Sequence, residues 1–359
     1  MDCGGTENFI MNIYRNIDRS KIQFDFLVHT NKRCFFDDEI EQKGGHIFRV
    51  PYYNITNLIA YKKAINNLFL EHQEWSVVHG HLGSCACIYL RIARKHGIYT
   101  IAHSHAIKNK KITIKELLYR LHAYLSRGSA DYYMGCSHEA GVDRYGKRIV
   151  ESNIYKVINN GILSEDYNYN PIIRDEVRKE LGIQNCYIIG HIGRFNFVKN
   201  HTFMVEVLVE LKKIKSDYVM MFVGDGELRK QIENQAKRSD VYGSIIFTGI
   251  RKDVSRMLQA MDHFIFPSYN EGLGIGLIEA QASGLPCIAN KDGIIPLAKV
   301  SDLVEFLPLN AGAEKWAEEI DKRRNCISQR PIMSSTIKNA GFDIVEVSKW
   351  LESFYTRTK

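Results

Sequence analysis

Short runs of apolar residues alternate along the chain with longer segments in which apolar residues recur every three or four positions. The short runs predict buried strands and the longer segments predict amphipathic helices; their alternation is typical of a mostly parallel sheet covered by helices. In the first half we expect strands at residues 23–30, 46–50, 76–80, 98–103, 131–136 and 155–158, and helices at 7–16, 57–71, 84–95 and 114–125. In the second half we expect strands at 187–192, 218–223, 245–248, 263–266 and 286–289, and helices at 201–214, 227–237, 275–283 and 314–323.

The two halves repeat this α/β architecture without repeating its sequence. A chain of 359 residues is also longer than one ordinary core accommodates, so we expect two domains. The polar stretch 159–171, which contains Asn159-Asn160-Gly161, reads as the linker between them. The last segment, 344–355, carries an apolar stripe, so it needs a surface to pack against.

Composition narrows the class of protein. Hydrophobic residues make up 45% and charged residues 25% of the chain, which is ordinary for a globular protein, and no run approaches the roughly 20 apolar residues of a membrane span. The first residues hold no basic run followed by an apolar core, so no signal peptide is expected. Eight cysteines occur without a CxxC pair, which favours reduced thiols. We therefore expect a cytoplasmic protein.

The net charge of +7 is concentrated in the first half: residues 1–160 hold 22 lysines and arginines against 15 acidic residues, whereas the remainder holds 26 of each. A cluster of this charge consists of Lys108, Lys110, Lys111, Lys115 and Arg120. Such a cluster fits an anionic membrane surface or a phosphorylated acceptor, and it equally fits a solvated helix face. Nucleic acid is not expected, because no aromatic residues are interleaved with the charge.

The strongest chemical signal lies where the strand ending at Phe266 gives way to a helix. Gly272, Gly274 and Gly276 allow the backbone to approach a ligand, and the amino end of the following helix suits a phosphate. Glu271 precedes this helix and Glu279 lies about one turn inside it. Ionised carboxylates accept hydrogen bonds, so this pair suits hydroxyl groups, although a glycine-rich turn with two surface glutamates has the same pattern.

A second loop with the same logic follows the strand that ends near Ile192. Arg194 and Lys199 are presented just before a helix. A guanidinium grips phosphate oxygens in pairs and an ammonium supplies a point charge. Either residue alone would be interpreted as a solvated surface charge. Two phosphate-suited loops at the carboxyl ends of strands in one domain predict a single ligand site.

Together these motifs resemble those of the family 4 retaining glycosyltransferases of the GT-B fold, especially bacterial enzymes of capsule, exopolysaccharide or O-antigen synthesis. The resemblance rests on Gly-Arg-x4-Lys at Arg194 and Lys199, on Val223-Gly224-Asp225-Gly226, and on Glu-x7-Glu at Glu271 and Glu279, and it extends over nearly the whole chain. It implies two Rossmann-like domains that face each other across a cleft, with the terminal helix returning to the first. The expected boundaries are 1–160 for the acceptor-side domain, 161–340 for the donor domain and 341–359 for the terminal helix.

The resemblance also assigns roles to residues of the donor domain. It implies that Arg194 and Lys199 hold the donor diphosphate together with the backbone at Gly274, Ile275 and Gly276. Glu279 would bind the ribose and Glu271 the donor sugar. The backbone at Gly249 and Ile250 would meet the base. The implied donor is a nucleotide-diphosphate sugar, with uridine the expected nucleoside, and the implied acceptor is a lipid-linked saccharide.

In the first half, the family places a histidine at the end of a strand, facing the donor sugar. His105 aligns best with it and His103 is the alternative, whereas His79 and His81 are interpreted as structural. An imidazole exchanges its proton near neutral pH, which suits a role beside the reacting carbon. Gly4 and Gly5 match the family's glycine loop.

No Asp-x-Asp occurs, so no metal clamp and no cofactor are expected, and cationic side chains with helix amino ends would neutralise the diphosphate. No carboxylate is evident for a covalent intermediate. The resemblance therefore implies front-face transfer, in which the departing phosphate oxygen takes the acceptor's proton. The main alternative is a non-catalytic subunit that binds sugar nucleotides. Epimerases and phosphorylases of similar architecture, and an oxidoreductase, fit the motifs less well.

The family's glycine loop follows a central strand, but only three residues precede Gly4 here. We therefore expect that strand to be missing, the first strand to lie within 23–30, and an unfilled groove beside it. We further expect a chain extended by about 12–15 residues, a strand with its lead-in, to be more soluble.

Overall fold

The computed structural model describes residues 4–105, 121–324 and 330–358. The chain divides into two compact units: Met1–Gly161 with Asp343–Lys359, and Ile162–Phe342. The basic cluster at 108–120 lies outside the described residues. None of the helices in the described part is both long and apolar enough to cross a membrane.

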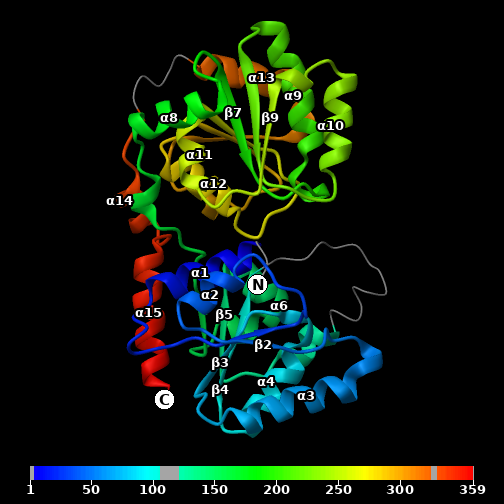
Figure 1. Ribbon diagram of the computed structural model, residues 1–359, viewed down its shortest axis with the longest axis vertical. Coiled ribbons are helices and arrows are strands. Elements are labelled where there is room, and N and C mark those ends of the chain that lie inside the picture. Colours follow the sequence, from blue (N-terminus) through cyan, green and yellow to red (C-terminus); the bar gives the residue numbers. More distant parts are fainter. Residues whose placement is uncertain (1–3, 106–120, 325–329, 359) are drawn as a thin grey trace. The chain divides into compact units, whose positions relative to one another are not determined.

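The first unit is built on two parallel sheets, one of two strands ordered β1-β2 and one of four ordered β3-β4-β5-β6 (Figure 1). Its strands are β1 (Phe26–Val28), β2 (Ile47–Arg49), β3 (Val77–Gly80), β4 (Tyr99–Ser104), β5 (Tyr132–Gly135) and β6 (Tyr155–Val157). Its described helices are α1 (Gly5–Asn16), α2 (Asp37–Gln42), α3 (Leu58–Glu71), α4 (Ala86–Lys95), α6 (His138–Tyr145), α7 (Lys147–Val150) and α15 (Ile344–Arg357). All six predicted strands of this half are present.

The terminal helix α15 belongs to the first unit, where it packs against α1. Asp343 caps its start by accepting from the backbone of Val345 and Glu346. Lys21 pairs with Glu352 at 3.0 Å, and the buried ring of Tyr355 packs edge-on against Phe24. The apolar stripe expected of this segment thus finds its surface on the first unit.

A cavity of about 1010 Å³ opens between the two sheets of the first unit. It is lined by β1 on one side, by β3 on the other and by Ile10 and Ile13 of α1. Within the described residues β1 pairs only with β2, and β3 only with β4, so each strand leaves one edge unpaired toward the cavity. The first described strand therefore lies where the sequence predicts it, and the groove expected beside it is present.

The second unit is a single parallel sheet of six strands, ordered β12-β11-β10-β7-β8-β9. The strands are β7 (Tyr187–Ile192), β8 (Tyr218–Val223), β9 (Ile245–Gly249), β10 (His263–Phe266), β11 (Cys287–Asn290) and β12 (Val304–Leu307). The helices are α8 (Pro171–Leu181), α9 (His201–Ile214), α10 (Arg229–Arg238), α11 (Val254–Ala260), α12 (Ile275–Ala282), α13 (Gly312–Arg323) and α14 (Ser334–Asn339). The edge strand β12 and the helices α8, α11 and α14 are additions to the predicted elements.

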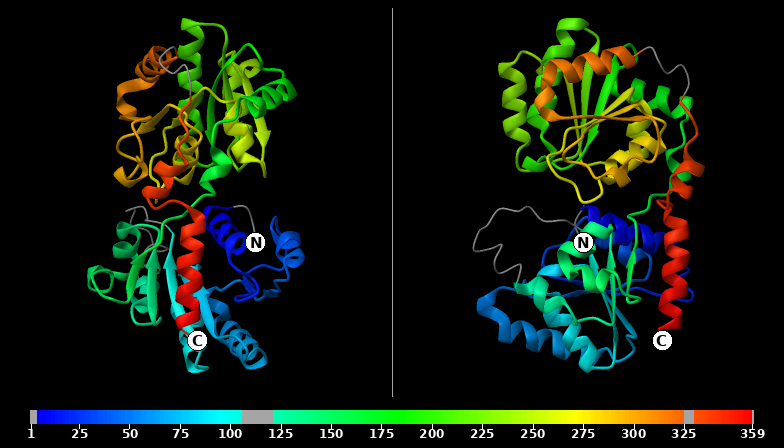
Figure 2. Two further views of the ribbon diagram at one scale, coloured as in Figure 1. Left: turned by 90° about the vertical axis from the view of Figure 1, so that its left-hand side faces the viewer. Right: turned by 180° about the vertical axis from the view of Figure 1, so that it is seen from behind.

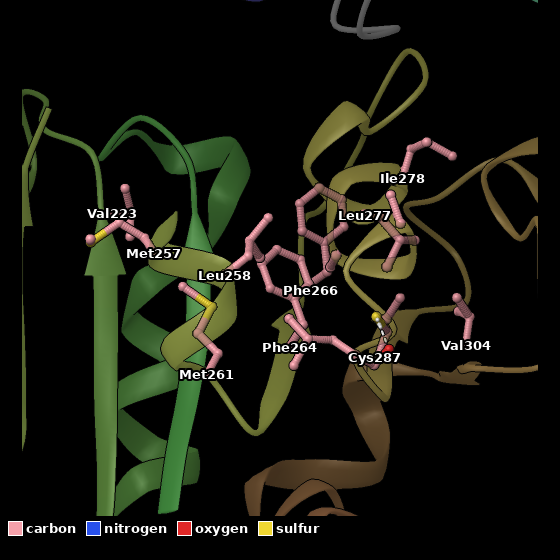
Figure 3. Packing of buried hydrophobic residues seen from close by; sticks show 14 of the residues in the cluster. Val223, Met257, Leu258, Met261, Phe264, Phe266, Leu277, Ile278, Cys287 and Val304 are labelled. Carbon is pink, nitrogen blue, oxygen red and sulfur yellow. Dashed lines mark hydrogen bonds between the residues drawn. The ribbon is translucent and has the colours of Figure 1, made fainter. Parts of the chain in front are cut away.

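Helices cover both faces of this sheet (Figures 1 and 2). One core packs the strands against α8, α11, α12 and α14, and Figure 3 shows part of it, with Phe264 and Phe266 of β10 beside Leu277 of α12. The opposite core packs them against α9, α10 and α13. Because both faces are buried, the strands read as continuous apolar runs, and this is why they were recognisable in the sequence.

Candidate active site

The two phosphate-suited loops meet at the point where the strand order of the second unit reverses. From β7 the chain extends the sheet through β8 and β9 on one side, and through β10, β11 and β12 on the other. Parallel sheets bind ligands outside the carboxyl ends of their strands at such a reversal. The loop with Arg194 and Lys199 follows β7, and the loop with Glu271 follows β10, so the sheet brings both to the same place.

Side chains and backbone fasten these two loops together. Lys199 Nζ lies 2.7 Å from Glu271 Oε1 and 4.8 Å from the centre of the Phe266 ring. Tyr269 donates its backbone N–H to the carbonyl of Val198 at 2.8 Å. The side chains of the ion pair are largely buried, at 18% and 14% exposed, so each charge depends on the other for solvation. The charge of Lys199 is therefore held at the carboxyl ends of β7 and β10.

The amino end of α12 closes against the same strands. Gly274 precedes the helix with φ of 77°, a left-handed conformation that favours glycine. A Cβ on Gly276 would lie 3.4 Å from the carbonyl oxygen of Ile192, an ordinary van der Waals contact, so the first turn of the helix lies close to the end of β7. First-turn N–H groups lack partners within a helix and attract anions. The predicted backbone site at Gly274, Ile275 and Gly276 is thus next to the Lys199 loop.

Glu279 lies one turn into α12, and the structure gives it a partner that the sequence does not indicate. Tyr167, in a 3₁₀ turn at Ser164–Tyr167, donates to Glu279 Oε1 at 3.0 Å. Burial raises the pKa of Glu279 to about 7, against the opposing effects of the Tyr167 hydrogen bond and the Lys199 charge. One carboxylate oxygen is thus engaged by Tyr167. No pattern around residue 167 indicates this role, because the two residues are 112 positions apart.

Arg194 and the Gly249 segment lie at the edge of this group. Arg194 is 71% exposed and its Nε lies 3.2 Å from Glu227, so it is held less firmly than Lys199. Gly224 donates its N–H to the carbonyl of Gly249 at 2.8 Å, and a Cβ on Gly224 would overlap the carbonyl of Gly193. The ends of β7, β8 and β9 are therefore in contact through glycine backbone. Ile250, just beyond, is 55% exposed.

In the first unit, the two candidate histidines belong to a larger group. His103 is buried at the end of β4, and His105 follows it. His105 Nε2 lies 2.8 Å from His81 Nδ1, and His79 Nε2 lies 3.2 Å from His103 Nδ1. Burial lowers the pKa of His105 to about 4, against an opposing hydrogen bond to Asn160. The expectation of a pKa near neutrality is therefore wrong: burial keeps this imidazole uncharged at physiological pH.

The remaining predictions for the first unit concern the glycines at the start of α1 and two histidines of β3. Gly4 is extended and caps α1, whose first residue is Gly5. A Cβ on Gly5 would meet nothing within 4 Å, so space does not require glycine there. His79 and His81, which were interpreted as structural, contact the candidate histidines directly, so the fold brings all four into one group. The signal that would have found them is His-x-His at the ends of two strands.

Comparisons with known proteins decide the family. Residues 173–325 match the model of the family described as glycosyl transferases group 1. EpsF of Bacillus subtilis (strain 168), described as a glycosyltransferase, is 32% identical over 353 residues, 96% of this chain and 91% of that protein. The chain is a group 1 glycosyltransferase.

More distant relatives of this glycosyltransferase agree with its fold. An Escherichia coli enzyme, UDP-Gal:alpha-D-GlcNAc-diphosphoundecaprenol alpha-1,3-galactosyltransferase, is 27% identical over 282 residues, 75% of this chain and 72% of the enzyme. The crystal structure of Anabaena HepE in complex with UDP-glucose superimposes with a TM-score of 0.80 at 18% identity, covering 99% of this chain and 96% of HepE. The two units are thus the Rossmann-like units of the GT-B fold.

Proposed function

We propose that this glycosyltransferase transfers a hexosyl group, with retention of configuration, from a uridine-diphosphate sugar to a lipid-linked saccharide during surface polysaccharide synthesis. The observation that carries the proposal is the Lys199–Glu271 pair at the strand reversal of the second unit. It places a cation suited to phosphate beside a carboxylate suited to sugar hydroxyls. The E. coli relative is named for a UDP-galactose donor and a diphosphoundecaprenol acceptor, and the HepE structure holds UDP-glucose.

The donor is held by residues already described. Lys199 and Arg194 neutralise the diphosphate together with the first turn of α12, so the reaction needs no metal at this point. Glu279 accepts from the ribose hydroxyls through the oxygen that Tyr167 leaves available. The backbone at Gly249 and Ile250 receives the base, and Gly4 and Gly5 form the glycine loop of the acceptor-side unit.

Transfer proceeds on one face of the sugar. The bond from the anomeric carbon to the phosphate oxygen breaks, the acceptor oxygen bonds to that carbon from the same side, and the departing phosphate oxygen takes the acceptor's proton. Glu271 holds sugar hydroxyls, and His105, or His103 in its place, hydrogen-bonds the donor sugar as a neutral imidazole. Lys199 stabilises the negative charge that develops on the leaving diphosphate.

The test is a transfer assay with a panel of sugar nucleotides and an undecaprenyl-diphosphate saccharide, in the presence and absence of EDTA. Glu271→Gln and His105→Ala should retain the fold and lose turnover, and NMR of the product should show the anomeric configuration of the donor. A product of opposite configuration contradicts retention. Binding of UDP-sugar with neither transfer to any acceptor nor hydrolysis of the donor would instead favour a non-catalytic sugar-nucleotide-binding subunit.

We place the enzyme in the cytoplasm, at the inner face of the cell membrane, through the basic residues Lys108, Lys110, Lys111, Lys115 and Arg120. Each such charge contributes roughly 1 kcal/mol near anionic lipid. Flotation with vesicles of pure phosphatidylcholine and of phosphatidylcholine with phosphatidylglycerol tests this. Binding that ignores lipid charge and salt would remove the membrane proposal and leave the donor site untouched.

A further inference from the structure

The four histidines of the first unit form an array on one face of two neighbouring strands. His79 and His81 stand two positions apart at the end of β3, and His103 and His105 stand two positions apart at the end of β4. Residues two apart on a strand share a face. The parallel register pairs His79 with Ile101 and Gly80 with Ala102, so its continuation places His81 beside His103. The sheet therefore gathers imidazoles from two strands at one spot.

Three of these histidines have the geometry of a metal-ion site. His79, His81 and His103 each offer one ring nitrogen, and these three nitrogens lie within 4.8 Å of one another. Around zinc, nitrogens at about 2.0–2.1 Å in a tetrahedron are roughly 3.3 Å apart. The 3.2 Å between His79 Nε2 and His103 Nδ1 is already close to this separation, and the His81 nitrogen lies within 4.8 Å of both.

The rings are suited to bind a metal ion. A neutral imidazole has one nitrogen lone pair, and this is the form of histidine that coordinates a metal. Among the described residues, His103 Nε2 has no hydrogen-bond partner, so it can carry the ring proton while Nδ1 binds a metal. The ring of Phe9 packs against His81 and His103 and shields the group from solvent.

Two further features complete a site of this kind. The hydroxyl of Tyr355 lies 2.6 Å from His79 Nδ1. If that nitrogen donates to the hydroxyl, Nε2 keeps its lone pair for a metal, and such outer partners orient ligating histidines in metal sites. The cavity between the sheets is lined by His79 and His81, so an ion and a water molecule can reach the group from there. Three histidines with an open fourth position are a known zinc arrangement.

We propose that His79, His81 and His103 bind one divalent transition-metal ion, of which zinc is the best match, with a water molecule in the fourth position. Imidazole ligands and a tetrahedral geometry favour zinc over magnesium or calcium, which take oxygen ligands. All three ligands belong to the first unit. Metal binding by these rings does not depend on the proposed reaction, because the imidazoles and the cavity beside them involve no residue of the donor loops.

Cobalt(II), which adopts zinc geometry and absorbs visible light, is the probe. The metal-free full chain should bind one Co²⁺ with the intense bands of a tetrahedral complex, and Zn²⁺ should displace it. His79→Gln, His81→Gln and His103→Gln should each weaken binding at least about tenfold. His46→Gln is the matched control, since His46 is an exposed first-unit histidine, 76% exposed at its side chain, and should bind as the wild type does. Circular dichroism checks that each variant is folded.

Because the variants alter buried residues, zinc-edge X-ray absorption of the unaltered chain provides a second measurement. Three imidazole nitrogens at about 2.0–2.1 Å are expected in the one-to-one complex. Absence of saturable one-to-one binding would overturn the proposal and leave the histidines as a hydrogen-bonded group. Unchanged affinity in the three folded variants, or fewer than three imidazole ligands, would overturn it equally. None of these measurements uses glycosyl transfer, so they are independent of the proposed function.

Discussion

Replacing Glu279 by glutamine should remove a pH-dependent loss of stability from this glycosyltransferase. In the folded chain the carboxyl keeps its proton up to about pH 7, whereas the ordinary pKa is 4.5. Between these values the folded state binds more protons than the unfolded state, so the free energy of unfolding falls as pH rises and levels off above about 7. Glutamine keeps an oxygen for Tyr167 and carries no charge, so this dependence disappears.

The size of the effect follows from the distance between the two pKa values. At roughly 1.4 kcal/mol per pH unit, the interval from 4.5 to about 7 corresponds to about 3 kcal/mol at most. Glu279→Gln should therefore match the wild type near pH 4.5 and exceed its stability by up to that amount at pH 8. The variant should also bind UDP more weakly at pH 8, because a carboxylate accepts ribose hydroxyl bonds more strongly than an amide.

The assay is urea unfolding of both proteins at several pH values from 4.5 to 8.5, followed by UDP titration at each. Other titrating groups are common to both proteins, so the difference between them isolates Glu279. Glu206→Gln, an exposed position on α9, is the matched control and should leave the difference independent of pH. The reasoning is refuted if Glu279→Gln falls in stability with pH as steeply as the wild type does.

Two other predictions rest on contacts of the same site. Lys199→Ala should weaken UDP binding by about 1.5–3 kcal/mol and also reduce stability, because it leaves the largely buried Glu271 without its cation. Arg194→Ala, at an exposed position, should weaken UDP binding alone. If both variants bind UDP as tightly as the wild type does, the donor assignment is contradicted. The hydrogen bond from Tyr167 lowers the pKa of Glu279, so Tyr167→Phe should raise this pKa further and shift the pH midpoint of UDP binding upward. An unchanged midpoint would show that Tyr167 does not position the carboxylate.

Local sequence determined most of the elements and half of the donor site. Both faces of the six-stranded sheet are buried, so its strands are apolar runs that stand out without any knowledge of their neighbours. The exceptions in the second unit have local causes. The edge strand β12 has only four residues and includes Glu305, and α8 follows a polar stretch that reads as linker up to its first residue, Pro171. The helices α11 and α14 have seven and six residues, too few to show a clear helical repeat. Glycine spacing and the charges at Lys199 and Glu271 were likewise visible, since backbone freedom and charge are properties of the residues themselves.

What the sequence could not supply was which strands become neighbours. The adjacency of β7 and β10 joins Lys199 to Glu271 across 71 intervening residues, and only the order of strands in the sheet decides it. The same holds for Tyr167 beside Glu279 and for the four histidines on β3 and β4. The pKa values of Glu279 and His105 also come from the tertiary structure, because desolvation depends on everything packed around a group and on no local pattern. Residue types thus defined the chemistry available, and packing decided which of those groups meet and in which charge state.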